Sequence, residues 1–131
     1  MARELYGAEY RKRVLELNAS DDRGIQAIRE KVKTFAQKMV TKLEVKSLAE
    51  FQIIILDEAD LLSTDAQSAL RRIIEDNSNQ TRFCIICNYV SKIIDPIVSR
   101  CAKFRFNALS EESQIKHLKE IATQENMKIV S

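Results

Sequence analysis

The chain has 131 residues, of which 45% are hydrophobic and 31% charged, and a formal net charge of +2. This describes one ordinary folded domain, or a piece cut from a longer chain. It excludes a membrane span of roughly 18 to 20 apolar residues, a secretory signal and, with three cysteines, a disulfide framework. We therefore expect an intracellular protein with reduced thiols and no membrane partner.

The charges are unevenly distributed along the sequence. Residues 1–46 hold eleven Lys or Arg against seven Asp or Glu, and residues 82–106 hold five against one. The remainder of the chain is acidic. Such segregation permits a surface that faces phosphates, but two solvated helix faces explain it equally well.

The first half of the sequence alternates strand and helix patterns. Residues 13–17 (RVLEL) predict a short strand, and turn residues at 18–21 precede a helix from about residue 23 to about residue 41. The nearly apolar segment 51–56 predicts a parallel strand covered on both faces. A capping box at 64–67 then begins a second long helix.

The second half continues this alternation. A buried strand is predicted at 82–87 and a shorter one at 102–106, with Asp95-Pro96 breaking the chain between them. Acids at 111–112 begin a last helix. The order of strand, helix, strand, helix, strand, strand and helix predicts an α/β fold with a mostly parallel sheet flanked by helices.

Cys84 and Cys87 have the C-x-x-C spacing that can indicate metal or redox chemistry. They lie in an apolar run that reads as a strand, where residues three apart point to opposite faces. Because the two sulfur atoms cannot then reach one metal ion, we interpret them as core cysteines.

Asp57 and Glu58 follow the apolar run Ile53–Leu56, at the carboxyl end of a predicted parallel strand. Open parallel sheets bind ligands beyond that end. Hydrolysis of a nucleoside triphosphate needs one carboxylate to hold magnesium and another group to orient or deprotonate water. Asp57 fits the first role and Glu58 the second, although two acids can also simply end a strand.

A phosphate loop of the form G-x-x-x-x-G-K-[ST] would complete such a site, because its backbone amides surround the phosphates. The glycines of this sequence are Gly7 and Gly24, seventeen residues apart, and neither is followed by lysine. The opening ARELYG looks like the tail of the helix that would follow such a loop. We therefore expect a nucleotide site without its phosphate loop.

Five segments together resemble the small subunits of replication factor C, the clamp-loading AAA+ ATPases of eukaryotes and archaea. The resemblance covers essentially the whole chain and implies a partial AAA+ P-loop NTPase fold, with the ATPase core at 1–108 and the start of a helical lid domain at 109–131. The segments are LELNASDDRGI (15–25), IIILDEAD (53–60), AQSALRRIIE (66–75), TRFCIICNYVSKIIDPIVSRCAKFRF (81–106) and LSEES (109–113).

The resemblance implies roles for four side chains at an ATP site. Asp57 matches the acid that holds Mg2+ through the nucleotide, and Glu58 matches the catalytic base. Asn88 matches sensor 1, which contacts the γ-phosphate or the attacking water. Arg100 matches the arginine finger that reaches the nucleotide of a neighbouring subunit. Taken without the family, Asn88 is a turn residue and Arg100 a surface arginine.

The resemblance also implies contact with DNA. Arg23, Arg29 and Lys92 match positions that usually touch the phosphate backbone of primed duplex DNA, and solvated charges are the alternative. Contacts with phosphates predict binding that is independent of sequence and sensitive to salt. Arg71 and Arg72 match arginines that support contacts between subunits.

The implied parent protein is nuclear and uses ATP and Mg2+, with other replication factor C subunits, to load the sliding clamp PCNA onto primed DNA in replication and repair. Without a Walker A loop, this chain is expected to bind ATP weakly and not to hydrolyse it alone. One alternative is a non-catalytic AAA+-like binding or assembly module, and another is a bacterial-type loader or branch-migration ATPase. The missing loop should also leave a central strand unpaired, which favours self-association.

Overall fold

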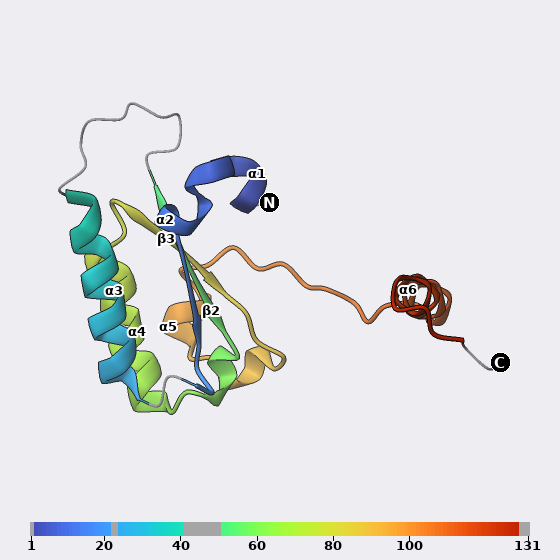
Figure 1. Cartoon of the computed structure of the whole chain (residues 1–131). Helices are drawn as coiled ribbons and strands as arrows, with labels where there is room; N and C mark the ends of the chain where they lie inside the picture. Colours follow the sequence, from blue (N-terminus) through green and yellow to red (C-terminus); the bar gives the residue numbers. More distant parts are fainter. Residues whose placement is uncertain (1, 22–23, 41–50, 129–131) are drawn as a thin grey trace.

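The computed structural model of the chain describes residues 2–21, 24–40 and 51–128. Its centre is a parallel sheet of three strands in the order β1 (Val14–Asn18), β2 (Gln52–Asp57) and β3 (Thr81–Ile85). Helices α3 (Ile25–Val40) and α4 (Thr64–Asp76) connect these strands and lie side by side (Figure 1). The predicted α/β fold is confirmed.

Shorter elements surround this centre, and none of the described helices is long and apolar enough to cross a membrane. In Figure 1 the last helix stands apart from the sheet, at the end of an extended segment. The remaining elements are α1 (Ala2–Tyr6), η1 (Gly7–Glu9), α2 (Tyr10–Arg13), η2 (Ala59–Leu61), η3 (Val90–Lys92), α5 (Asp95–Val98) and α6 (Glu111–Gln124).

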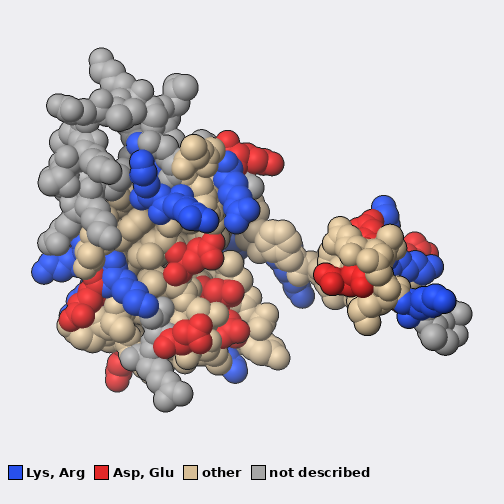
Figure 2. Space-filling view, viewed as in Figure 1, with Lys and Arg blue, Asp and Glu red and all other residues tan. Residues whose placement is uncertain are grey.

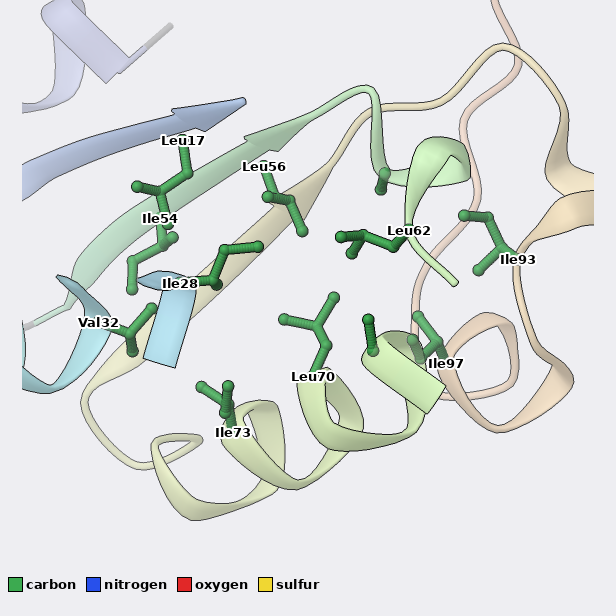
Figure 3. Close-up of a cluster of buried hydrophobic side chains, with 12 residues drawn as sticks. Leu17, Ile28, Val32, Ile54, Leu56, Leu62, Leu70, Ile73, Ile93 and Ile97 are labelled. Atoms are coloured by element: carbon green, nitrogen blue, oxygen red, sulfur yellow. The ribbon is translucent and has the colours of Figure 1, made fainter. Parts of the chain in front are cut away.

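The hydrophobic core lies between one face of the sheet and the helices. Leu17, Leu56 and Ile85 pair across the three parallel strands and therefore share this face. Figure 3 shows Leu56 pointing towards side chains from α3 and α4. Ile28 and Leu70, one from each helix, are each only 1% exposed. The apolar stripes from which the two helices were predicted are thus the faces that the helices bury against the sheet.

The opposite face of the sheet is less covered than the sequence predicts. Ile53 and Ile55 on β2 are only half-buried, and Cys84 on β3 is exposed. The helices that build the core lie on the other face, so the alternate residues of β2 and β3 remain accessible. The described residues therefore cover the second face of β2 only in part, and the interpretation of Cys84 as a core cysteine is wrong.

Cys87 is half-buried, and burial together with the nearby Asp60 carboxylate raises the pKa of its thiol. Burial also raises the pKa of the Cys101 thiol. Both effects favour the protonated thiol, which is a poor nucleophile and a poor metal ligand. Within the described residues, no three His, Cys, Asp or Glu side chains gather in a group that could hold a metal ion.

The strand predicted at 102–106 does not form. The segment carries no ladder bonds, and Phe104 and Phe106 are 81% and 91% exposed. Its alternation of phenylalanine with basic residues suits a half-buried strand, but a strand is stable only beside a partner. Here α5 follows β3 and the chain then runs away from the sheet (Figure 1), so β3 remains an edge of the described sheet.

The start of α4 also differs from its prediction. The capping box placed the cap at Thr64, but the side chain of Ser63 accepts the hydrogen bond from the Ala66 amide at 3.2 Å. Gln67 does not reach back to the cap. Its side chain is buried, because it lies on the core-facing side of α4 between Ala66 and Leu70.

Gln67 ties α4 to the chain that follows β3. Its Nε2 donates to the carbonyls of Leu62 (3.1 Å) and Lys92 (2.8 Å), and its Oε1 accepts from the Ile94 amide at 2.8 Å. All the groups of this amide are therefore satisfied although the residue is only 2% exposed. Gln67 thus anchors the segment that carries Lys92 to α4.

Replacing Gln67 with leucine is expected to lower the free energy of unfolding by about 2 kcal/mol, because the buried backbone partners lose their bonds. Unfolding in urea, followed by circular dichroism, measures the change. Gln26→Leu on the exposed side of α3 is the matched control and should change stability by less than about 0.5 kcal/mol. Equal losses in the two variants would contradict this role of Gln67.

Candidate functional site

The candidate site lies at the edge of the sheet where the parallel strands end (Figure 1). Asp57 is the last residue of the central strand and pairs in register with Asn18 at the end of β1. The Asp57 carbonyl accepts a hydrogen bond from the Ala19 amide at 3.0 Å, and the Leu56 carbonyl accepts one from the Ile86 amide at 2.9 Å. The two neighbouring segments of the chain therefore hold the backbone of Asp57 rigidly between them.

The Asp57 side chain is half-buried, and its Oδ1 accepts a hydrogen bond from the Glu58 amide at 2.8 Å. That bond fixes the carboxylate and leaves Oδ2 for a cation. Mg2+ takes six oxygen ligands and is usually held by one or two carboxylates, water and substrate phosphates. Asp57 therefore fits a magnesium ion that arrives with a nucleotide, and does not form an all-protein metal site.

Glu58 has an unusual backbone conformation. Its φ of 54° and ψ of 37° lie in the left-handed region, which side chains other than glycine rarely adopt. The bond to Asp57 Oδ1 and the bond from the Leu61 amide to the Glu58 carbonyl (3.0 Å) hold this turn. Strain of this kind persists only where neighbours impose it, and it concentrates at functional sites.

Glu58→Gly is expected to raise the free energy of unfolding by about 1 kcal/mol, because glycine adopts a positive φ without steric cost. Asp60→Gly is the control, since Asp60 lies two residues on, within η2, and should lose stability as a helical residue does. Urea unfolding of both variants provides the comparison. A Glu58→Gly chain no more stable than wild type would show that the turn is unstrained.

Asn88 lies three residues beyond β3, not at the strand end as the sequence suggested, and it is exposed. Because β2 and β3 are parallel, it emerges at the same edge as Asp57 and Glu58. Next to it, Lys92 Nζ lies 4.9 Å from the centroid of the Tyr89 ring, a cation–π contact. The structure thus brings Asn88 to the predicted edge.

Arg29 lies on the exposed side of α3, by a groove of about 530 Å3 between α3 and α4. Lys33 and Arg72 line the same groove, together with Asp76. Arg23 falls outside the described residues. On the face drawn in Figure 2, several basic side chains gather in the upper part of the body that holds the sheet and several acidic ones lie below them, with charges of the opposite sign among both.

Arg100 follows α5 and faces α4. Its Nη2 lies 2.8 Å from Glu75 Oε1, and its Nη1 donates to the Pro96 carbonyl at 2.8 Å. Among the described contacts none joins Arg100 to Asp57 or Glu58. A finger that serves a neighbouring subunit has no need of such a contact, and its side chain is 45% exposed.

The sequence reasoning did not find Glu75 or the bonding role of Gln67. A signal for Glu75 exists, because an acid in the last turn of a helix opposes the helix dipole. No comparable signal exists for Gln67, whose partners Lys92 and Ile94 lie 25 and 27 residues further along the chain.

The three-stranded parallel sheet flanked by helices is the architecture of an AAA+ core. A solved structure shares this fold: the DNA polymerase III gamma subunit-related protein of Thermotoga maritima, with a TM-score of 0.59 at 17% identity. The match covers 94% of this chain and 43% of that one. Likeness at this identity concerns the fold alone.

The family follows from sequence. Residues 10–110 match the family described as DNA polymerase III, delta subunit, and the chain belongs to this clamp-loader family. It is 58% identical to replication factor C subunit 4 of Homo sapiens and 55% identical to subunit 2 of Saccharomyces cerevisiae, over 98% of this chain in both cases. A Haloarcula marismortui small subunit is 49% identical over 98% of the chain.

These matches confirm the resemblance to replication factor C small subunits. The chain covers 36% of the human protein and 38% of the yeast and archaeal ones, so it spans little more than a third of the relatives' length. The relatives come from eukaryotes and archaea alike.

Proposed function

We propose that the chain is part of a clamp-loader subunit that uses ATP to load the sliding clamp PCNA onto primed DNA. The observation that carries the proposal is the position of Asp57 and Glu58 at the carboxyl end of the central parallel strand, in a chain of the clamp-loader family. That edge is where open parallel sheets bind nucleotides. Other replication factor C subunits are the partners, and the nucleus is the compartment.

Each side chain has a distinct part in hydrolysis. Asp57 would hold Mg2+, which neutralises charge on the phosphates when it is bound. Glu58 would take a proton from the attacking water, and Asn88 would orient that water or the γ-phosphate. Arg100 would act on the nucleotide of the neighbouring subunit, where a guanidinium stabilises charge on the transferred phosphoryl group.

The triphosphate needs donors that these residues do not supply. The sequence contains no G-x-x-x-x-G-K-[ST], and Asp57 and Glu58 would repel phosphates in the absence of a cation. We therefore propose that residues 1–131 alone bind magnesium ATP weakly and do not hydrolyse it. Calorimetric titration tests this point, and micromolar affinity for the isolated chain would overturn it.

Turnover in the assembly tests the function as a whole. A loader reconstituted with the full-length subunit should hydrolyse ATP faster when PCNA and primed DNA are both present, and Asp57→Asn should abolish that increase. A turnover rate that does not change when PCNA and primed DNA are added would overturn the proposal. Stimulated turnover that survives Asp57→Asn would favour the alternative, a non-catalytic binding or assembly module.

Arg29, Lys92 and Arg23 are the proposed contacts with the DNA backbone. Arg29 supports the proposal most directly, because it is exposed and lies beside Lys33 and Arg72, which add positive charge to the same groove. Lys92 is exposed on a segment that Gln67 holds in place. Fixed basic groups of this kind position a protein on DNA without reading bases.

Arg29→Ala is expected to weaken binding of the assembly to primed DNA equally for all sequences. The slope of log affinity against log salt should fall by about 0.9, the value of one phosphate contact on B-form DNA. Fluorescence anisotropy over a salt series measures the slope. Lys119→Ala on α6 is the control, and an unchanged slope for Arg29→Ala would show that its charge is merely solvated.

A further inference from the structure

Glu75 occupies an unfavourable place for an acid. It lies in the last turn of α4, next to Asp76, and that turn contains no basic residue. The carboxyl end of a helix carries partial negative charge, so a carboxylate there destabilises the helix. A residue in such a place needs a compensating contact from elsewhere in the fold.

Arg100 supplies this contact. The 2.8 Å distance between Arg100 Nη2 and Glu75 Oε1 is that of a charge-assisted hydrogen bond. Arg71 Nε is 3.8 Å from the same oxygen, in the less favourable i,i+4 order with the base first. Of the two arginines beside Glu75, Arg100 is therefore the closer partner.

The contacts orient the guanidinium of Arg100. A guanidinium has five N–H donors in one plane. Glu75 takes a donor from Nη2 and the Pro96 carbonyl takes one from Nη1, which fixes that plane from two sides. Three donors remain on a side chain that is 45% exposed, and these can meet phosphate oxygens of another molecule.

We propose that Glu75 is a positioning residue for Arg100, holding its guanidinium ready for the triphosphate bound by a neighbouring subunit. This inference rests on the proposed function, which gives Arg100 a contact in trans. A long flexible side chain loses rotamer freedom when it engages a ligand, and Glu75 removes much of that loss beforehand. The effect belongs to the transition state, so it changes kcat more than KM.

Turnover of the reconstituted assembly tests the proposal. Glu75→Ala should lower kcat at the nucleotide of the neighbouring subunit about fivefold, the upper end of what one exposed ion pair supplies, with the KM for ATP changed less than about twofold. Glu75→Gln keeps an acceptor for Arg100 and should recover most of the rate. Asp65→Ala removes an exposed acid from the first turn of the same helix and should leave kcat unchanged.

A double-mutant cycle separates positioning from a merely structural effect. In an Arg100→Ala background, Glu75→Ala should cause no further loss of kcat. A further loss would show that Glu75 acts independently of Arg100 and would overturn the proposal. An unchanged or raised kcat for Glu75→Ala alone would also overturn it, the raised rate indicating that Glu75 restrains the finger.

The trans contact of Arg100 and the role of Glu75 can be disproved separately. If Arg100→Ala leaves turnover unchanged, the contact in trans is wrong, and Arg100 is not the arginine finger of the proposed function. If Arg100→Ala slows turnover but Glu75→Ala does not, only the inference about Glu75 is wrong. Should Glu75→Ala fail to fold, Glu75→Leu, a good helix former that also removes the acceptor, takes its place in both Arg100 backgrounds.

Discussion

Glu58→Gln is expected to lower hydrolysis at this subunit's own nucleotide in the assembled loader about a thousandfold, because an amide cannot take a proton from water and a positioned general base contributes roughly 10²- to 10⁴-fold. The side chains have nearly the same shape, and the bonds that hold the turn at residue 58 are made by its backbone. Folding and nucleotide binding should therefore remain. Steady-state hydrolysis and urea unfolding measure both properties.

Asp60→Asn is the matched control for this experiment. It removes a negative charge two residues away, within η2, without touching the proposed base. Turnover should change less than about twofold, since a remote charge acts only through a screened field. Similar losses in the two variants would show that the rate depends on the total negative charge at this edge of the sheet, and that Glu58 does not act as a specific base.

Arg100→Ala is expected to lower hydrolysis at the nucleotide of the neighbouring subunit by about a thousandfold, the smaller end of the effect that arginine fingers have on phosphoryl transfer. The affinity for ATP should change little, because the guanidinium acts mainly on charge that develops in the transition state. Arg100→Lys should restore only part of the rate, since a lysine cannot make the planar two-pronged contact. Single-turnover hydrolysis separates binding from chemistry.

The nucleotide site that loses activity shows whether Arg100 acts on its own subunit or on the neighbouring one. In an assembly where one subunit alone carries Arg100→Ala, hydrolysis should fail at the neighbour's nucleotide and persist at the mutant subunit's own. Arg105→Ala, in the exposed segment that precedes α6, is the control. Loss confined to the mutant subunit's own nucleotide would contradict an action in trans.

Much of the fold could be predicted because local patterns and packing agree. The apolar run before Asp57 forms β2, one residue displaced from its predicted limits. The helical spacing that includes Ile28 and Val32 forms the buried side of α3. In these segments the periodicity of burial and the intrinsic preference of the residues favour the same element.

The errors arise where a partner distant in sequence decides the outcome. Residues 102–106 alternate like a strand, but no neighbouring strand pairs with them. Cys84 lies in an apolar run, yet its exposure depends on which face of the sheet the helices cover. Ser63 and Thr64 are both good caps, and Ser63 accepts the capping bond of α4.

The candidate site likewise has parts that could be predicted from the sequence and parts that could not. Asp57 and Glu58 could be located from the sequence, because they directly follow the apolar run and must therefore lie at the carboxyl end of its strand. The left-handed turn at Glu58 could not, since glycine, the residue that usually marks a positive φ, is absent from this position. The contact between Glu75 and Arg100 joins residues 25 positions apart and appears only in the folded chain.

The central claim is that this chain carries the magnesium-holding and catalytic acids of an ATP-driven clamp loader. Loading of labelled PCNA onto primed circular DNA, by an assembly that contains the full-length subunit, tests it most directly. The wild-type assembly should load the clamp only with ATP, and Asp57→Asn should reduce loading at least about a hundredfold. Loading at the wild-type rate by the Asp57→Asn assembly would contradict the claim.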